Sequence, residues 1–292
     1  MSNKNKSFIY GIVCHRRNSS FDCLVDELLK SKNSIIIVHV DKKTDITDFS
    51  KYRNIDRIIF ASNRVDVRWG SFSQIEATLE LINLAQDYDY CYFSLLSGDD
   101  ACIRGVQDIE CFLKKNDGYE FLGQDTKNKF EHRVKYMHPW FYFKKGNSRS
   151  IIDKILVKIC DKAHAVGVLR QNMDGIPKLH KGSNWFTLTK KAIEYILDFI
   201  KNNPNYIKVY KKSFCADEIF FHTILFNSNL KANIYLNGTY NSLRYVDWNT
   251  GPDLPRFLDK TDFEKIKCSD ALFARKMSHI LTDSDIRSLI SH

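Results

Sequence analysis

The segment that decides the fold is Tyr90-Cys91-Tyr92-Phe93-Ser94-Leu95-Leu96-Ser97-Gly98-Asp99-Asp100, an apolar run that ends on two carboxylates. The uncharged stretch Tyr90–Leu96 is typical of a strand buried on both faces, as in a parallel sheet covered by helices. Because open parallel sheets bind ligands beyond the carboxyl ends of their strands, the Ser97–Asp100 turn is also expected at a binding site.

Three shorter apolar runs lie upstream and predict further strands. Phe8–Val13 leads toward His15, and the β-branched run Ile35–Val40 ends on Asp41. Arg57–Phe60 is a third short strand, and helical spacing of apolar residues separates the first two. This alternation predicts an α/β fold with a mostly parallel central sheet flanked by helices, with the polar strand ends gathered at one edge.

The rest of the chain predicts helices and one irregular region. Ser71-Phe72-Ser73-Gln74 has the pattern of a capping box, in which serine and glutamine side chains bind the first amides of a helix. From Thr126 to His180 the pattern loosens, and we interpret this stretch as an insertion at the edge of the sheet, with a helix over Ile151–Val168. The other expected elements are a helix around Ile103–Phe112 that ends before Gly118, strands at Tyr119–Leu122 and Trp185–Leu188, a helix opened by Thr189, and a helix over Phe214–Leu225.

Size and charge bound the class of protein. The chain has 292 residues, of which 43% are hydrophobic, and a formal net charge of +9. These values suit one globular domain spanning residues 1–292, and no repeat, low-complexity stretch or linker divides it. The positive charge suits a polyanion such as nucleic acid, an acidic membrane face or a nucleotide diphosphate, although scattered lysines also serve plain solubility.

Targeting signals and cysteine spacing indicate the compartment. No stretch approaches the ~20 apolar residues of a membrane span, and the first apolar run is too short for a signal peptide. We therefore expect a cytoplasmic location, unless an anchor precedes the chain. The eight cysteines include no CxxC pair and no zinc spacing, so we expect buried, reduced thiols.

The adjacent carboxylates Asp99 and Asp100 raise the question of a metal site. Side chains alternate along a strand, so neighbouring carboxylates on a regular strand do not both face one ion. An aspartate here is instead expected to hold the donor ribose or sugar, or to cap the next helix.

Seven blocks of sequence, taken in order, resemble one family of enzymes. The chain resembles the core-2 and I-branching β-1,6-N-acetylglucosaminyltransferases and peptide O-xylosyltransferases (glycosyltransferase family 14), from about residue 8 to 277. Animal members carry an N-terminal membrane anchor and lumenal disulfides, so this chain looks more like bacterial members. The blocks are Val38–Lys43, Val67–Gly70, Leu95–Asp100, Lys181–Thr189, Ala216–Phe221, Tyr245–Trp248 and Leu272–Lys276.

The resemblance implies a GT-A-like fold and transfer with inversion at the anomeric carbon. It implies a nucleotide-sugar-binding half at about residues 8–125 and an acceptor-binding and catalytic half at about 126–292. Direct inversion needs one general base, and the matching residue is Glu218. The first turn of a helix favours a carboxylate there, although Asp217 and Glu218 could simply cap that helix.

The donor implied by the resemblance is UDP-GlcNAc, with UDP-xylose as the alternative. No metal or other cofactor is implied, because basic side chains neutralise the leaving diphosphate. Lys276 is the matching lysine, with Arg256 or Arg275 beside it, although Arg256 could be an ordinary loop residue. Gly182 is expected to let the backbone approach a ligand. Candidate donor-binding residues are Val13, His15, Asp41, Arg68, Trp69, Ser97, Asp100, Ser183 and Asp217, and Trp69 could equally belong to the core.

The implied acceptor is a glycan or a lipid-linked saccharide, as in bacterial polysaccharide biosynthesis at the inner face of the membrane. Trp248 is expected to stack on an acceptor sugar, with core packing as its alternative. Asp247, Arg244, Arg133 and Tyr136 are further acceptor-binding candidates. Two other classes of function are a catalytically inactive sugar-binding scaffold and a nucleic-acid-binding protein, and no nucleic-acid recognition motif supports the second.

Overall fold

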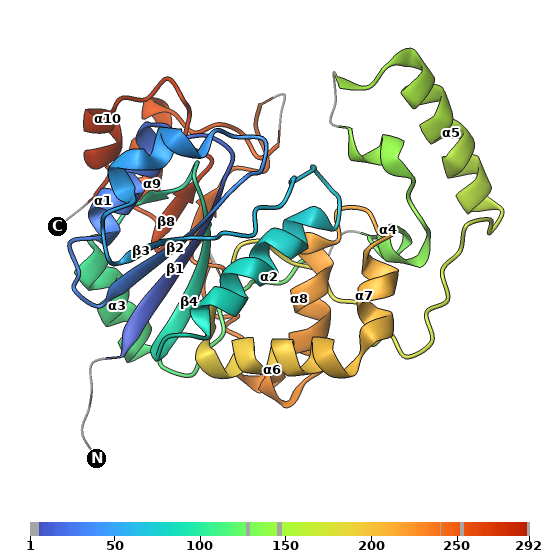
Figure 1. Cartoon of the computed structure of the whole chain (residues 1–292), viewed down its shortest axis with the longest axis horizontal. Coiled ribbons are helices and arrows are strands. Elements are labelled where there is room, and N and C mark those ends of the chain that lie inside the picture. The colour runs from blue at the N-terminus through green and yellow to red at the C-terminus, as the bar shows by residue number, and fades with distance from the viewer. Residues whose placement is uncertain (1–5, 127–128, 145–147, 240, 252–253, 291–292) are drawn as a thin grey trace.

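The computed structural model describes residues 6–126, 129–144, 148–239, 241–251 and 254–290, and a five-stranded sheet forms its centre (Figure 1). Its strands are β1 (Ser7–Cys14), β2 (Ser34–Val40), β3 (Ile58–Phe60), β4 (Tyr90–Ser97) and β6 (Thr187–Thr189). They lie in the order β3-β2-β1-β4-β6, and the first four run parallel while β6 runs antiparallel to β4. The predicted α/β fold with a mostly parallel sheet is confirmed.

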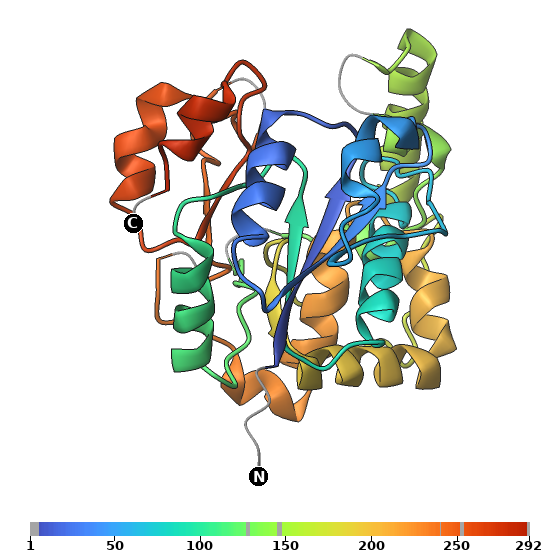
Figure 2. The same cartoon turned by 60° about the vertical axis from the view of Figure 1, so that its left-hand side comes forward.

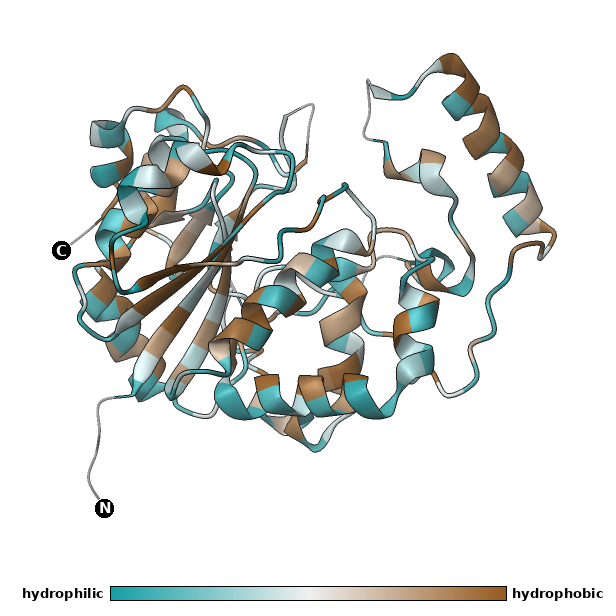
Figure 3. Ribbon diagram, viewed as in Figure 1, coloured by the Kyte–Doolittle hydropathy of each residue, from teal (hydrophilic) through white to brown (hydrophobic). Residues whose placement is uncertain are grey.

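Helices cover both faces of this sheet, as Figures 1 and 2 show. Along β1, Ile9 belongs to one apolar cluster while Tyr10 and Ile12 belong to another, because successive side chains of a strand point to opposite faces. Figure 3 shows the resulting apolar strands as brown ribbons at the centre of the molecule. The first cluster includes α2 (Ser73–Ala85), α6 (Lys190–Asn202) and α8 (Asp217–Phe226), and the second includes α1 (Ser19–Leu28) and α3 (Val106–Lys115).

The carboxyl ends of the three central strands lie level with one another. Val13 of β1 pairs with His39 of β2 and with Ser97 of β4. The amide of Gly98 donates to the Val13 carbonyl at 3.0 Å. A Cβ on Gly98 would lie 2.7 Å from the Cβ of Cys14, so a side chain at this position would force the strand ends apart. The residues that follow each strand therefore gather at one edge of the sheet.

A second, three-stranded sheet carries the C-terminal part of the chain to that edge. It consists of β5 (Ala101–Cys102), β8 (Phe273–Arg275) and β7 (Arg244–Val246), in the order β5-β8-β7. The amide of Met277, just after β8, donates to the Asp99 carbonyl at 2.9 Å. The last elements are η5 (Lys260–Asp262), α9 (Phe263–Lys267) and α10 (Asp283–Arg287). Helices α9 and α10 contribute to a third apolar cluster, and α10 packs on α1.

The predicted insertion is present, but it does not lie along the edge of the sheet. Its main helix, α5 (Ile151–Ala165), packs on the 3₁₀ helix η2 (Trp140–Phe143) and stands away from the sheet at the upper right of Figure 1. The remaining elements are η1 (Ile46–Tyr52), α4 (His132–Lys135), α7 (Pro204–Tyr210) and η4 (Asn229–Asn233). Within the described residues, no helix has the length and apolar composition that crossing a membrane requires.

Several local predictions are corrected. The capping box does not form, because the Ser71 hydroxyl accepts from the Ser73 amide and the Gln74 side chain accepts from the Gly70 amide at 2.8 Å. Residues 119–122 form isolated bridges rather than a strand. Helix α8 begins at Asp217 rather than Phe214, because Cys215 has a positive φ of 45°. All eight cysteines are free, as predicted, although Cys111 and Cys268 are exposed.

Candidate active site

The end of β4 places Asp99 among cations from distant parts of the chain. Its carboxylate accepts from Asn18 at 2.9 Å and from Arg16 at 3.3 Å, and lies 3.3 Å from the Lys276 ammonium. Burial alone would raise the pKa of Asp99, but the charges of Lys276 and Arg16 outweigh it and hold the pKa below its usual value. Asp99 is therefore a buried anion that gathers positive charge at the strand ends.

Asp100, the next residue in the turn after β4, faces different partners. Its fully buried carboxylate accepts from the Ser97 amide and hydroxyl, both at 3.0 Å, and from Arg275 at 2.6 Å. The Arg275 guanidinium also lies 4.0 Å above the Trp185 ring. Among the residues that the structure describes, no group of three or more His, Cys, Asp or Glu side chains is placed to hold a metal ion. Protein cations are the partners of both aspartates.

An alternating chain of charges follows the end of β2. The Asp41 carboxylate accepts from the Lys43 amide and ammonium, both at 2.9 Å. The same ammonium lies 2.5 Å from Asp66, which pairs in turn with Arg68 at 2.9 Å. The predicted donor residues Asp41 and Arg68 are thus connected through Lys43 and Asp66, which the sequence analysis did not select.

The turn after Arg68 connects this chain of charges to the start of α8. The Gly70 carbonyl accepts from the Cys215 amide at 2.7 Å, and a Cβ on Gly70 would lie 2.9 Å from the Phe214 ring. Trp69 packs edge-on against Phe214 at 5.4 Å between ring centroids, and 41% of it stays exposed. Trp69 is therefore anchored to the protein at one edge and open to solvent elsewhere.

Glu218 stands in the first turn of α8 and faces two cations. Its Oε2 accepts from Arg133 at 2.8 Å and lies 3.5 Å from the Lys181 ammonium. Lys181 also pairs with Asp125 at 2.8 Å. The Glu218 side chain is 26% exposed, so solvent and small ligands reach it. The carboxylate is directed to side chains rather than to the helix amides, which disagrees with a simple capping role.

Asp217, the neighbour of Glu218, has a different environment. It is buried, and burial raises its pKa, with the charge of Glu218 acting in the same direction. No cation lies within ion-pair distance of Asp217 in the part of the chain that the structure describes. Protonation of Asp217 removes a negative charge from beside Glu218.

One short segment, residues 181–185, contacts Glu218 and also Arg275, the cation that binds Asp100. Lys181 reaches Glu218 at its start, and the Trp185 ring supports Arg275 at its end. The Ser183 hydroxyl accepts from the Trp185 amide at 3.2 Å and orders the turn between them. The segment therefore links the surroundings of Glu218 to those of Arg275, and Ser183 shapes the backbone between them.

The expected role of Gly182 is not supported. A Cβ at this position would lie 2.3 Å from the His222 ring and 2.6 Å from the Gly123 carbonyl oxygen. His222 is fully buried beneath it, and burial lowers the pKa of His222 to about 4. Glycine is required here for close packing against the protein, rather than for approach to a ligand.

Arg256, which is predicted to bind the diphosphate, forms ion pairs with aspartates near it in the chain rather than with the aspartates at the strand ends. The Arg256 guanidinium is engaged within the protein, because it donates to Asp247 at 3.0 Å and binds the buried Asp262. Asp247 also accepts from Thr250 and from the Asn249 amide, and these bonds hold its pKa well below the usual range. Arg256 and Asp247 therefore brace a loop, and Arg275 and Lys276 are the C-terminal cations at the strand ends.

The prediction that Arg244 binds the acceptor is wrong. Only 1% of Arg244 is exposed, and its guanidinium donates to the carbonyls of Leu95 at 2.7 Å and Phe186 at 3.1 Å. Burial lowers its pKa to about 9. By contrast Trp248 is 54% exposed, which excludes core packing and leaves its ring available to an acceptor.

The other predicted residues lie around these clusters. Val13 is half-buried at the end of β1, and the carbonyl of the exposed His15 accepts from Thr44 at 2.7 Å. Tyr136 stacks on His164 at 4.8 Å, so it connects α5 to the short segment that bears Arg133. The functional candidates that the sequence did not reveal are Arg16, Asn18, Lys181 and Asp125, while the sequence points to Asp99 only together with Asp100. Lys181 belongs to one of the seven blocks that resemble the family, and Arg16 directly follows His15.

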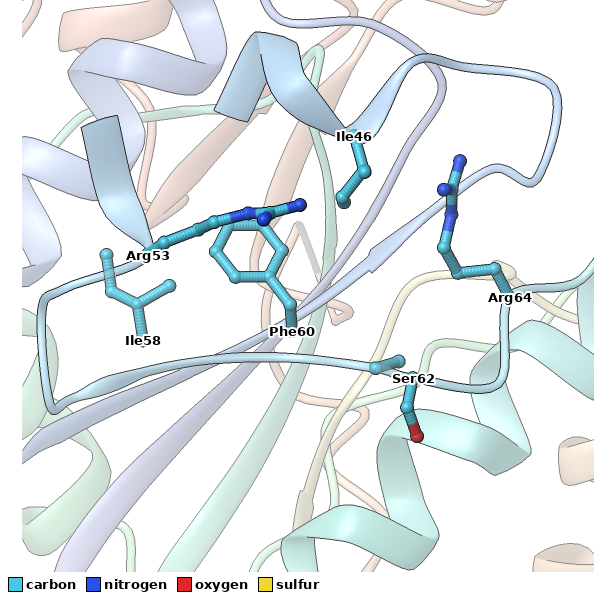
Figure 4. Close-up of a pocket in the computed structure, with 7 residues that line it drawn as sticks. Ile46, Arg53, Ile58, Phe60, Ser62 and Arg64 are labelled. Carbon is cyan, nitrogen blue, oxygen red and sulfur yellow. The ribbon is translucent and has the colours of Figure 1, made fainter. Parts of the chain in front are cut away.

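An open cavity of about 450 Å³ lies at the β3 edge of the sheet (Figure 4). It contains none of the predicted site residues. Arg64, on one of its walls, donates to the carbonyls of Val40 at 3.0 Å and Asp41 at 2.7 Å. The cavity thus adjoins the turn that carries Asp41 without being part of the site. Its lining residues are Ile46, Arg53, Ile58, Phe60, Ala61, Ser62 and Arg64.

Comparison with known proteins finds relatives that match most of this chain. The chain is 26% identical over 267 residues to Beta-glucuronosyltransferase GlcAT14B of Arabidopsis thaliana, covering 84% of this chain and 56% of that protein. It is 25% identical over 250 residues to Xylosyltransferase 1 of Rattus norvegicus, covering 82% of this chain and 27% of that protein. The matched part thus spans about half of the first relative's length and about a quarter of the second's.

The likeness to solved structures is slight. A putative glucose-1-phosphate thymidylyltransferase from Bacillus anthracis shares 9% identity and a TM-score of 0.32, over 68% of this chain and 83% of that one. The family match is far more extensive, because the family described as Core-2/I-Branching enzyme matches residues 8–278. The chain therefore belongs to the Core-2/I-Branching enzyme family.

Proposed function

We propose that the chain is an inverting glycosyltransferase that moves a sugar from a UDP-sugar to an acceptor hydroxyl, with Glu218 as the general base. Family membership supports glycosyl transfer. The observation that carries the site assignment is the 181–185 segment, because it contacts Glu218 at one end and Arg275 at the other. A base and a diphosphate-binding cluster must face one substrate from two sides, and this segment joins them.

Glu218 can act as a base because its contacts are one-sided. Arg133 and Lys181 both contact Oε2, so we assign Oε1 to the acceptor hydroxyl. In the proposed step, Oε1 takes the proton, the hydroxyl oxygen attacks the anomeric carbon, and the bond to the diphosphate breaks on the opposite side. The two cations hold the carboxylate in place for this attack.

The leaving diphosphate is assigned to the cations at the strand ends. Lys276 and Arg275 are held there by Asp99 and Asp100, and Arg16 lies beside them. Preorganised cations stabilise charge that develops on a leaving group, and a guanidinium suits two phosphate oxygens at once. We propose that these side chains act without a metal ion.

For the donor sugar we propose GlcNAc, on the resemblance of the seven sequence blocks to the branching N-acetylglucosaminyltransferases. UDP-xylose is the second candidate, supported by the match to Xylosyltransferase 1, and UDP-glucuronic acid is supported in the same way by GlcAT14B. The proposed acceptor is a glycan or a lipid-linked saccharide that contacts the exposed Trp248 ring. We place the reaction in the cytoplasm, at the inner face of a membrane.

A thermal-shift panel with UDP and the UDP-sugars of GlcNAc, xylose, glucuronic acid, galactose and glucose tests the donor. UDP at saturating concentration is expected to raise the Tm by several degrees, because a ligand bound only to the folded state stabilises it. Release of UDP from the preferred sugar in EDTA is expected to match the rate without EDTA. Loss of activity in EDTA with recovery on Mn²⁺ would overturn the metal-free proposal, and no Tm response to UDP would overturn the donor class.

A further inference from the structure

The outer face of α5 exposes large apolar side chains. Ile151, Ile152, Ile155 and Ile159 are 77%, 69%, 52% and 58% exposed, and Val166 just beyond the helix is 78% exposed. At 100° per residue these positions fall on one side of the helix. Figure 3 shows the brown stripe along α5, and Figure 1 shows that the helix stands off the rest of the molecule.

The polar face of α5 is the one that holds it to the protein. Asp153 binds the Lys144 ammonium at 2.8 Å, and Asp161 accepts from the Tyr142 hydroxyl at 2.5 Å. His164 lies 3.0 Å from the Met137 carbonyl. A surface helix ordinarily turns its apolar stripe toward the core, so this inverted arrangement leaves the stripe for a surface outside the chain.

The charged side chains of α5 indicate what kind of surface its exposed isoleucines would contact. The two acidic side chains of α5 have partners in residues 142–144, Asp153 buried and Asp161 exposed, whereas Lys154, Lys158 and Lys162 are exposed beside the isoleucines. An apolar stripe bordered by lysines matches the interface of a bilayer that contains anionic lipids, with isoleucines at the acyl boundary and ammonium groups at the phosphates.

We propose that α5 docks the protein on an anionic membrane surface, lying in the plane of the interface with its isoleucine stripe inserted. Docking through α5 would explain how the protein reaches the proposed membrane location. It rests on the proposed function only in assuming that the acceptor is lipid-linked. Tyr136 stacks on His164 of α5, and Arg133, on the same short segment as Tyr136, binds Glu218. The docking element is thus tied to the segment that positions the base, as delivery of a lipid-linked acceptor requires.

Vesicle flotation of the full chain tests the docking. Wild type is expected to float with vesicles of phosphatidylcholine and phosphatidylglycerol, and to float less with phosphatidylcholine alone or at high salt. The triple variant Ile151→Gln/Ile155→Gln/Ile159→Gln is expected to bind more than about tenfold more weakly. The matched control Ile280→Gln alters an isoleucine that is 73% exposed elsewhere, and it should bind as wild type does.

A second variant separates charge from insertion. Lys154→Gln/Lys158→Gln/Lys162→Gln is expected to lose the preference for phosphatidylglycerol while keeping the weak binding to phosphatidylcholine. Equal flotation of wild type and the isoleucine variant would overturn the proposal. So would a wild-type dimer in analytical ultracentrifugation that the isoleucine variant turns into a monomer, since a second copy would then cover the stripe.

The Tm and its response to UDP report on folding and on the donor site in the same samples. Every variant above is expected to keep both. A chain that floats on anionic vesicles but shows no response to UDP would leave the docking intact and remove the proposed transferase function.

Discussion

Two pairs of adjacent carboxylates, Asp99-Asp100 after β4 and Asp217-Glu218 at the start of α8, look alike in sequence and differ in their surroundings. The first pair is buried, and its contacts include Arg16, Lys276 and Arg275. In the second pair only Glu218 meets cations, and burial raises the pKa of Asp217.

The difference shows how neighbouring groups decide what an acidic pair does. Cations hold the pKa of Asp99 below its usual value, and Asp99 in turn positions positive charge that we assign to a diphosphate. Burial favours the neutral form of Asp217, which reduces the negative charge beside Glu218.

The largest expected effect is that of Glu218→Gln, which keeps the shape of the side chain and removes the base. Transfer should fall by about 100- to 10,000-fold, because general-base catalysis contributes this much. The UDP-induced rise in Tm should stay, since the cation cluster is unaltered. Initial rates of UDP release with donor and acceptor check this, with Glu264→Gln on the exposed side of α9 as the control. Undiminished transfer by Glu218→Gln would remove Glu218 from the mechanism.

The pair Asp99-Asp100 is tested by changing Lys276, which contacts Asp99. Lys276→Ala should weaken UDP binding by about ten- to a hundredfold, as loss of a charged contact to phosphate typically does. Calorimetric titration with UDP measures it, and Lys265→Ala on α9 serves as a matched lysine control. An unchanged Kd for UDP would remove Lys276 from the proposed phosphate site. It would also contradict the proposed difference in role between the two carboxylate pairs.

The raised pKa of Asp217 should make the free energy of unfolding depend on pH. In the unfolded chain an aspartate loses its proton near pH 4, whereas the raised pKa keeps Asp217 protonated to higher pH in the folded chain. The folded state then binds more protons, so this group's contribution to the free energy of unfolding falls as the pH rises from about 4 through the folded pKa. Asp217→Asn should therefore gain Tm relative to wild type, by a few degrees, between pH 5 and pH 8.

Thermal melts of both proteins across this pH range measure the difference, and Asp56→Asn at an exposed turn is the control. A difference in Tm that stays constant with pH would mean that Asp217 is ionised like an ordinary aspartate. The two carboxylate pairs would then carry equal charge.

The smallest expected effect on the donor is that of Arg256→Ala. Arg256 is bound to Asp247 and to the buried Asp262, so UDP affinity should stay within about twofold of wild type. The Tm should fall, because Asp262 loses its cation inside the protein. A large loss of UDP affinity at unchanged Tm would place Arg256 in the phosphate site and restore the original prediction.

Much of the fold followed from local patterns, because each buried strand carries its own signal. The uncharged run before Ser97 and the β-branched run before Asp41 each predict a parallel strand, and the structure contains both. The start of α8 was misplaced because a positive φ at Cys215 ends the preceding turn, and no residue type there signals it. The capping motif failed because the Gln74 side chain binds Gly70 instead.

The site was only partly predictable because its partners are distant in sequence. Glu218, Arg275 and Lys276 came from the family resemblance, but an arginine in a loop does not reveal whether it meets a ligand or a buried aspartate. Arg244 shows the limit most clearly, since its guanidinium binds the Leu95 carbonyl 149 residues away. Such pairings depend on how two sheets meet, which local sequence does not encode.

The small sheet β5-β8-β7 has a consequence for the timing of biosynthesis. Asp99 and Asp100 emerge from the ribosome early, whereas Arg275 and Lys276 arrive on β8 after more than 170 further residues. A nascent chain can complete the strands of the main sheet while the donor site still lacks these cations. The proposed donor site is therefore complete only after Lys276 has been synthesised, so a chain that stops before β8 is not expected to hold the donor.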